Sequence, residues 1–236
     1  MMVLRLVIFF LTATSFCKGQ SSLGFPCLGK LVDGAGFLRE LCGVSGSLLV
    51  SAAASERVVS AGFSRTGGFV KTAISLQVLD GALVWEVSSP TGPALFAFGP
   101  TGTPRFAYLV ESNELLEWTG QFMRPVEFTP QGQVLSIATN SSGGWSAIVR
   151  REDSVVILTA TNVVDLAGQA ERALLLDGSR SLLFSEGNLR LADKSFPMAE
   201  APSVMEWINE DWIHLGGWVL RITPGKEALF QLPEAN

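Results

Sequence analysis

The sequence is poor in charged residues and contains a single histidine. Lysine, arginine, aspartate and glutamate make up 17% of the 236 residues, below the quarter typical of soluble domains, while glycine (24) and proline (11) are frequent. This composition argues against helical bundles and coiled coils, and a hydrophobic content of 47% excludes disorder. The formal charge of −5 argues against DNA or RNA as a partner, because phosphate binding needs surplus lysine and arginine.

The sequence also lacks the short motifs that mark common catalytic sites. It has no H-E-x-x-H, G-x-x-x-x-G-K-[ST], C-x-x-C or G-x-S-x-G string. One histidine cannot build a histidine-rich metal site, and His214 lies in an alternating segment, 212–215, typical of a structural histidine in a strand. We therefore predict that the chain is not an enzyme and has no catalytic, cofactor-binding or metal-ligating residues.

Residues 1–19 have the features of a secretory signal peptide. Arg5 supplies a positive charge, residues 6–13 form an apolar run too short to span a bilayer, and Cys17 and Gly19 are small residues at the expected cleavage positions. The alternatives are a buried N-terminal strand or helix, or a lipid anchor at Cys17, for which Phe16 is bulky. The sequence predicts an exported protein, periplasmic or secreted, with no membrane span after cleavage.

Removal of residues 1–19 leaves two cysteines, Cys27 and Cys42, and changes the net charge from −5 to −7. Residues 33–36 (Asp-Gly-Ala-Gly) form a turn signal midway between them, so the cysteines face each other across a hairpin with a four-residue loop. In an exported chain this pattern predicts a disulfide bond. The alternative is two reduced cysteines that pack as small apolar side chains.

A repeated turn motif runs through the rest of the chain. The pattern F-x-x-x-G occurs at 63–67, 98–102 and 128–132, at intervals of 35 and 30 residues, with variants at 175–179 and 207–211. Apolar runs flank each occurrence. A second turn follows most of them, at 80–81, 112–113, 140–144, 186–188 and 216–217. The unit is strand, turn, strand, turn, strand, and it recurs about every 36 residues.

Short strands joined by glycine-rich turns in units of this length are typical of a β-propeller, whose sheets bury both faces against their neighbours. We predict an all-β protein in which residues 20–236 form one propeller domain of six short blades, with five blades as the alternative and a β-sandwich as the competing fold. Packing between blades accounts for Trp85 and Trp118, which occupy equivalent strands. Residues 226–233 either complete the last blade or pair with the first.

Two segments resemble a known family of repeats. Residues 128–135 (FTPQGQVL) and 177–185 (DGSRSLLFS) are similar to the F-S-P-D-G-x-x-[apolar]-x-[apolar] core of WD40-like, TolB-type propeller repeats, and residues 98–102 match more loosely. The resemblance covers most of residues 55–225 as degenerate repeats. It implies a six-bladed propeller, exported to the periplasm or beyond, that acts as a protein-interaction module. The motif's aspartate is missing from three repeats, so no calcium or metal role is carried over.

The first turn of each unit is the predicted binding face, because equivalent turns converge on one side of a propeller ring. The candidate residues are Thr66, Gly67, Gly68, Pro100, Thr101, Gly102, Pro130, Gln131, Gly132, Asp177 and Gly178. We predict an exported, monomeric, non-catalytic module that binds an unknown protein or surface ligand without a cofactor, a metal or nucleic acid.

The alternative function is a glycosidase-like, carbohydrate-active enzyme, because propellers can place paired carboxylates in their central funnel. Carboxylates and indoles alternate in residues 206–218, where they could bind a sugar by hydrogen bonding and stacking. The candidate carboxylates are Glu206, Glu210 and Asp211, with Glu111, Glu114, Glu117 and Glu200 elsewhere in the chain.

Overall fold

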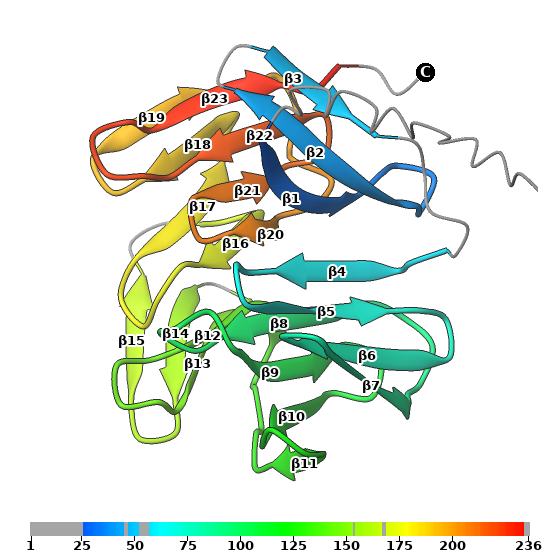
Figure 1. The fold of residues 1–236 in the computed structure, drawn as a ribbon. Helices are drawn as coiled ribbons and strands as arrows, with labels where there is room; N and C mark the ends of the chain where they lie inside the picture. Colours follow the sequence, from blue (N-terminus) through cyan, green and yellow to red (C-terminus); the bar gives the residue numbers. More distant parts are fainter. Residues whose placement is uncertain (1–25, 45–46, 52–56, 153, 167–168, 234–236) are drawn as a thin grey trace, which may run out of the picture.

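The computed structural model describes residues 26–44, 47–51, 57–152, 154–166 and 169–233, so the predicted signal peptide lies outside the described residues. Within these ranges every regular element is a β-strand. The strands form six antiparallel sheets that stand around a common centre as the blades of a ring (Figure 1). The prediction of an all-β, six-bladed β-propeller is confirmed, and the five-bladed ring and the β-sandwich are excluded.

Among the described residues, each blade consists of strands that follow one another in the chain, three in blade 1 and four in each of the others. Blade 1 contains β1 (Cys27–Val32), β2 (Leu38–Val44) and β3 (Ser47–Val50). Blade 2 contains β4 (Ser60–Phe63), β5 (Gly67–Lys71), β6 (Ser75–Asp80) and β7 (Leu83–Ser88). Blade 3 contains β8 (Ala94–Phe98), β9 (Pro104–Leu109), β10 (Glu114–Trp118) and β11 (Met123–Val126). Blade 4 contains β12 (Gln133–Thr139), β13 (Trp145–Arg150), β14 (Val155–Thr159) and β15 (Val163–Leu166). Blade 5 contains β16 (Arg172–Leu175), β17 (Ser181–Ser185), β18 (Asn188–Leu191) and β19 (Lys194–Pro197). Blade 6 contains β20 (Glu206–Asn209), β21 (Trp212–His214), β22 (Trp218–Arg221) and β23 (Ala228–Gln231).

The first strand of each blade is innermost and the last is at the edge of the ring. Contacts between neighbouring blades join β4 to β8, β8 to β12 and β12 to β16. In blade 2, inner β4 is buried throughout, whereas outer β7 is largely exposed. Small residues permit this close approach: a Cβ atom at Gly62 of β4 would lie 3.2 Å from the ring of Phe96 of β8.

Six apolar clusters hold the ring together, one at each interface between neighbouring blades. At the interface of blades 3 and 4, the ring of Phe128 packs edge-on between Tyr108 and Trp145, with centroids 5.4 and 4.9 Å away. Trp85 of blade 2 and Trp118 of blade 3 have ring centroids 5.7 Å apart, which confirms that they pack between blades. The prediction that they occupy equivalent strands was wrong, because Trp85 lies in the fourth strand of its blade and Trp118 in the third. Burying one large apolar side chain stabilises a fold by about 1.5–3 kcal/mol, so these clusters supply most of the cohesion between sheets.

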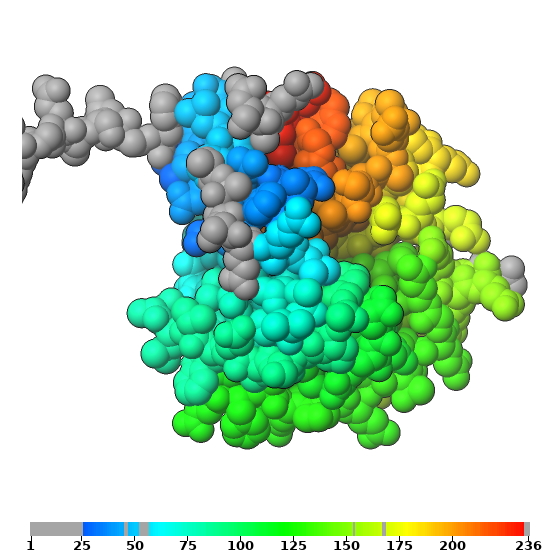
Figure 2. All heavy atoms as spheres, turned by 90° about the vertical axis from the view of Figure 1, so that its right-hand side faces the viewer, coloured from blue at the N-terminus to red at the C-terminus, as the bar shows by residue number. Residues whose placement is uncertain are grey.

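In the part of the chain that the structure describes, the ring closes through side chains and not through a shared strand. β23 pairs with β22, so residues 226–233 complete the last blade and do not pair with the first. Leu31 and Leu41 of blade 1 pack against Ile208 and Trp212 of blade 6. Figure 2 shows blade 1 (blue) between blade 2 (cyan) and the last blade (orange to red).

A second set of contacts joins blade 6 directly to blade 2. Arg65, in the turn between β4 and β5, donates its backbone N–H to Oε1 of Glu210 over 2.9 Å. Its Nη2 donates to Oδ2 of Asp211 over 2.8 Å. Strands β4 and β20 are also in contact, so the two four-stranded blades support each other beside the small first blade.

Cys27 and Cys42 form the predicted disulfide bond within the β1–β2 hairpin. The turn is one residue longer than predicted, because β1 ends at Val32 and β2 begins at Leu38. A bulge between Cys27 and Gly29 shifts the strand register by one residue and brings the two cysteines opposite each other. The cysteine pairing was therefore correct, although the loop length from which it was inferred was not.

We expect replacement of Gly29 by alanine to weaken ring closure. Gly29 has a φ of +153°, and a Cβ atom there would lie 2.6 Å from the backbone oxygen of Ile208 in blade 6. Overpacking of this kind costs about 1–3 kcal/mol, and each kcal/mol lowers the melting temperature by roughly 2–4 °C in a chain of this size. Thermal unfolding of Gly29→Ala should show this decrease. Gly34→Ala, in the same hairpin but with no atom within 4 Å of its Cβ, is the control and should unfold like the parent chain.

Candidate functional site

The two ends of the inner strands form two cavities at the centre of the ring. The last residues of β4, β8, β12 and β16, with the turns that follow, line a cavity of about 580 Å³, which we call the turn-face cavity. The first residues of the same strands line a second cavity of about 310 Å³. Trp207 of β20 lines both cavities and therefore lies where they approach each other.

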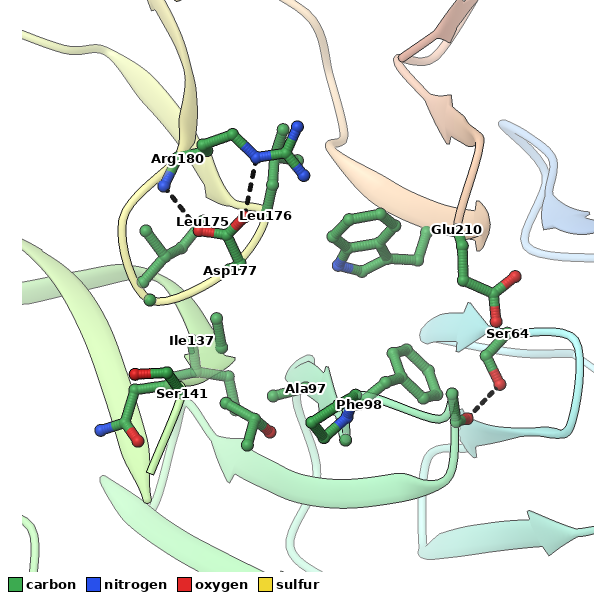
Figure 3. A pocket seen from close by; sticks show the side chains of 18 of the residues that line it. Ser64, Ala97, Phe98, Ile137, Ser141, Leu175, Leu176, Asp177, Arg180 and Glu210 are labelled. Atoms are coloured by element: carbon green, nitrogen blue, oxygen red, sulfur yellow. Dashed lines mark hydrogen bonds and ion pairs between the residues drawn. The ribbon is translucent and has the colours of Figure 1, made fainter. Parts of the chain in front are cut away.

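The turn-face cavity has an apolar interior and a polar rim. Its interior is formed by Ala97, Phe98, Ile137, Leu175 and Trp207, and its rim carries Ser64, Asn140, Ser141, Asp177, Arg180 and Glu210. Figure 3 shows Asp177 and Arg180 on one side of the cavity and Ser64 and Glu210 on the opposite side. An apolar cavity with a few convergent polar groups is the usual form of a ligand-binding site in a protein.

The structure brings together most of the residues predicted for the binding face. The members that line the turn-face cavity are Pro100, Gly102, Asp177 and Gly178. Thr66 and Thr101 lie next to each other on adjacent turns, where Oγ1 of Thr66 donates to the carbonyl oxygen of Thr101 over 3.4 Å. Gly67 and Gly68 are the first residues of β5 and have a packing role: a Cβ at Gly68 would lie 2.5 Å from the ring of Phe63.

Pro130, Gln131 and Gly132 lie at the other end of the ring. They precede β12, whose first residue, Gln133, lines the second cavity and whose last residue, Thr139, lines the turn-face cavity. The F-x-x-x-G motif marks the first turn of blades 2 and 3, but its third occurrence marks the link between blades 3 and 4. There Phe128 fills the interface between blades 3 and 4. Residues 128–132 therefore match F-x-x-x-G because of this packing and not because they form a first turn.

The true counterpart in blade 4 is the turn at 140–144, which joins β12 to β13. The prediction that 140–144 is a second turn was therefore wrong. Oδ1 of Asn140 accepts hydrogen bonds from the backbone N–H groups of Ser142 and Gly144, each over 3.0 Å. The turn of blade 5 touches it, because a Cβ at Gly178 would lie 3.0 Å from Cα of Asn140. An asparagine that closes a turn onto its own backbone is the signal that could have placed this segment on the binding face.

Asp177 organises the turn between β16 and β17. Its Oδ1 accepts hydrogen bonds from the backbone N–H groups of Ser179 and Arg180, both over 2.8 Å, and its Oδ2 accepts one from Nε of Arg180 over 2.7 Å. Burial raises the pKa of Asp177, but the hydrogen bonds from Arg180 and Ser179 outweigh burial and lower the pKa from 3.8 to about 2. Asp177 is therefore ionised near neutral pH and holds its turn in shape.

The carboxylates considered for a glycosidase are spread over the molecule. Glu210 lines the turn-face cavity, whereas Glu206 lines the second cavity. Glu117 is buried in blade 3, where its two carboxylate oxygens lie 2.5 Å from Nη2 of Arg105 and Nη2 of Arg124. Each of these three glutamates therefore has a different environment, and no two of them line the same cavity.

His214 is a buried strand residue, as predicted, but only one of its ring nitrogens is paired. Nε2 lies 2.8 Å from the carbonyl oxygen of Gly216. Nδ1 is buried, has no hydrogen-bond partner among the described residues and lies 3.8 Å from Oε2 of Glu206. The carbonyl oxygen of Gly216 can accept a hydrogen bond only from a protonated Nε2, so this contact fixes a proton on that nitrogen.

Within the described part of the chain, one group of three potential metal ligands is present: Cys27, Glu40 and Cys42. Both cysteines belong to the disulfide, so neither can act as a thiolate ligand. The described residues also include no helix with the length and apolarity needed to cross a membrane.

No protein-family model matches the sequence, and no curated protein matches it. Solved structures do match. Virginiamycin B lyase from Staphylococcus aureus is 11% identical, over 90% of this chain and 86% of the lyase, with a TM-score of 0.49. PorZ, a surface component of the type-IX secretion system of Porphyromonas gingivalis, is 13% identical over 89% of this chain, with a TM-score of 0.53, and the match spans 34% of PorZ. YCF48, solved with a D1 peptide bound, is 13% identical over 81% of this chain and 73% of its own length, with a TM-score of 0.44.

One prediction needs correction in view of these structures. We expected a protein that is not an enzyme, but an enzyme, virginiamycin B lyase, is among the similar structures. The absence of contiguous catalytic motifs is a poor criterion for a propeller, because a site at the ring centre draws single residues from several blades. At 11% identity and a TM-score of 0.49, the likeness assigns neither an activity nor a catalytic residue to this chain.

We expect Asp177→Asn to destabilise the protein in a pH-dependent way. The pKa of Asp177 is lower in the folded chain (about 2) than the ordinary value of 3.8, so its ionised form stabilises the fold fully above pH 3.8. That contribution is lost as the pH falls toward 2. The carboxylate is 42% exposed, so the loss near neutral pH should be at most about 1 kcal/mol. Chemical unfolding across this pH range measures it.

Asp165→Asn, which changes an exposed carboxylate on outer strand β15, is the matched control. The difference between Asp177→Asn and the parent chain should shrink below pH 3.8, whereas Asp165→Asn should show little difference at any pH. A difference for Asp177→Asn that stays constant down to pH 2 would contradict the assignment.

Proposed function

We propose that this chain is an exported binding module that holds a segment of a protein ligand in the turn-face cavity. The observation that carries the proposal is the cavity itself: about 580 Å³, apolar inside, and bordered by turns from several blades. A rigid ring supports these turns, so ordering them on binding costs little entropy. The resemblance of residues 177–185 to WD40-like, TolB-type repeats supports an interaction module of this kind.

Export is part of the same proposal. The features of residues 1–19 support it, and so does the Cys27–Cys42 disulfide, because disulfide bonds persist mainly in oxidising compartments. The similarity in fold to PorZ, itself a bacterial surface component, agrees with such a location.

A substitution that fills the mouth of the cavity tests the proposal. Ser141 is exposed and lines the turn-face cavity, so Ser141→Trp adds bulk there without disturbing a buried position. The purified chain is used to select binders from a displayed library of random peptides. Selected peptides should then bind Ser141→Trp at least about tenfold more weakly than the parent chain, a loss of about 1.4 kcal/mol.

Ser112→Trp is the control, because Ser112 is equally exposed but lies in the turn from β9 to β10, at the other end of the blade. It should bind the selected peptides like the parent chain. If the library yields no binders, or if Ser141→Trp binds them as tightly as Ser112→Trp does, the proposed function is wrong.

A further inference from the structure

The chemistry of the turn-face cavity points to a particular kind of side chain in the ligand. Arg180 is the cation that borders the cavity, and its side chain is 55% exposed. Its ion pair with Asp177 uses Nε. In Figure 3 the two Nη groups lie at the end of the guanidinium that is turned away from Asp177. This leaves a planar fork of N–H donors directed outward from the turn, the arrangement that matches the two oxygens of a carboxylate.

Asp177 does not occupy that fork. Its carboxylate accepts hydrogen bonds from the backbone N–H groups of Ser179 and Arg180, from the Ser179 hydroxyl and from Nε of Arg180. These bonds fix Nε of Arg180, so the side chain is already oriented before a ligand arrives. Asp177 acts here as a positioning residue, because it holds the arginine without competing for its outer N–H groups.

The carboxylate on the opposite rim is already paired. Oε1 of Glu210 accepts the backbone N–H of Arg65 over 2.9 Å, and Oε2 lies 3.4 Å from Nε of the same arginine. Glu210 also sits against Gly102, where a Cβ would lie 2.6 Å from Oε1. The rim therefore offers an incoming ligand one outward-facing cation, Arg180, while each of its two carboxylates, Asp177 and Glu210, is already held by a partner.

Between the two rims the wall of the cavity is apolar. Phe98, Leu176 and Trp207 line it, together with Ala97 and Ile137. A ligand that placed only a charge at Arg180 would leave this apolar surface in contact with water. A peptide that carries an apolar side chain next to the acidic one would bury it.

We propose that the turn-face cavity recognises an aspartate or glutamate side chain through Arg180, adjacent to an apolar side chain that packs on the cavity wall. This inference rests on the proposed function and names the class of ligand, which is a peptide segment with an acidic residue next to an apolar one. A charge-assisted hydrogen bond is worth more than a neutral one, so the acidic residue should raise affinity by about tenfold or more over its amide.

Three capped tripeptides serve as probes: N-acetyl-Leu-Asp-Leu-amide and the versions with Asn or Lys in place of Asp. Binding to the purified chain is followed by NMR through the indole N–H signal of Trp207, assigned with Trp207→Phe. The Asp peptide should bind about tenfold more tightly than the Asn peptide, and the Lys peptide should bind most weakly. Arg180→Gln should abolish the preference of Asp over Asn, and Arg180→Lys should keep part of it, because lysine retains the charge but not the fork.

Arg190→Gln, which removes an exposed arginine from strand β18, is the control and should leave the preference unchanged. Equal binding of the Asp and Asn peptides to the parent chain, or a preference that survives Arg180→Gln, overturns this inference while leaving the proposed function intact. Absence of binding by all three peptides also overturns this inference. The proposed function is then tested separately by the selection from the displayed peptide library.

Discussion

Face-to-face packing of neighbouring sheets is the constraint on which the rest of this structure depends. Each blade is covered on both faces, so few of its strand positions can carry a charge, and this explains the low charge content of the sequence. The same packing leaves the inner strands around a central axis, where their ends form cavities. The cavities and the stability of the ring therefore have one origin, because the packing that holds the blades together also holds the turns around the turn-face cavity in position.

The architecture could be predicted because its signals are local. Repeated turns reveal the units, and their spacing gives the blade count. The turn near the midpoint between Cys27 and Cys42 indicated their pairing, although a bulge in β1 is needed to bring them opposite each other. The failures come from contacts between segments far apart in the sequence. Phe128 mimics a turn motif because it fills an interface between blades, and the tight approach of Gly29 to Ile208 depends on which blades become neighbours when the ring closes.

The candidate site was predictable in part for the same reason. Asp177 and Gly178 belong to a turn whose residue types are visible in the sequence. Trp207 and Arg180 belong to turn segments that the repeat pattern places on one face, but only the closed ring shows that their side chains line one cavity. The prediction of a non-enzyme was poorly founded for the same reason, because it rested on contiguous motifs in a fold that assembles its sites from separate blades. His214 shows most clearly what the sequence could not predict. Its place in a strand was evident, but the sequence did not show that its Nδ1 lacks a hydrogen-bond partner and lies 3.8 Å from Oε2 of Glu206.

Each sheet is built from one uninterrupted segment of chain, and the last sheet takes no strand from the first. The blades are therefore modular units, and the join between first and last is a contact surface of the same kind as the other five. A gene duplication or deletion of one whole segment would change the size of the ring without leaving any sheet incomplete. Propellers that exchange a terminal strand lack this freedom, because both ends of their chain must remain matched whenever a blade is gained or lost.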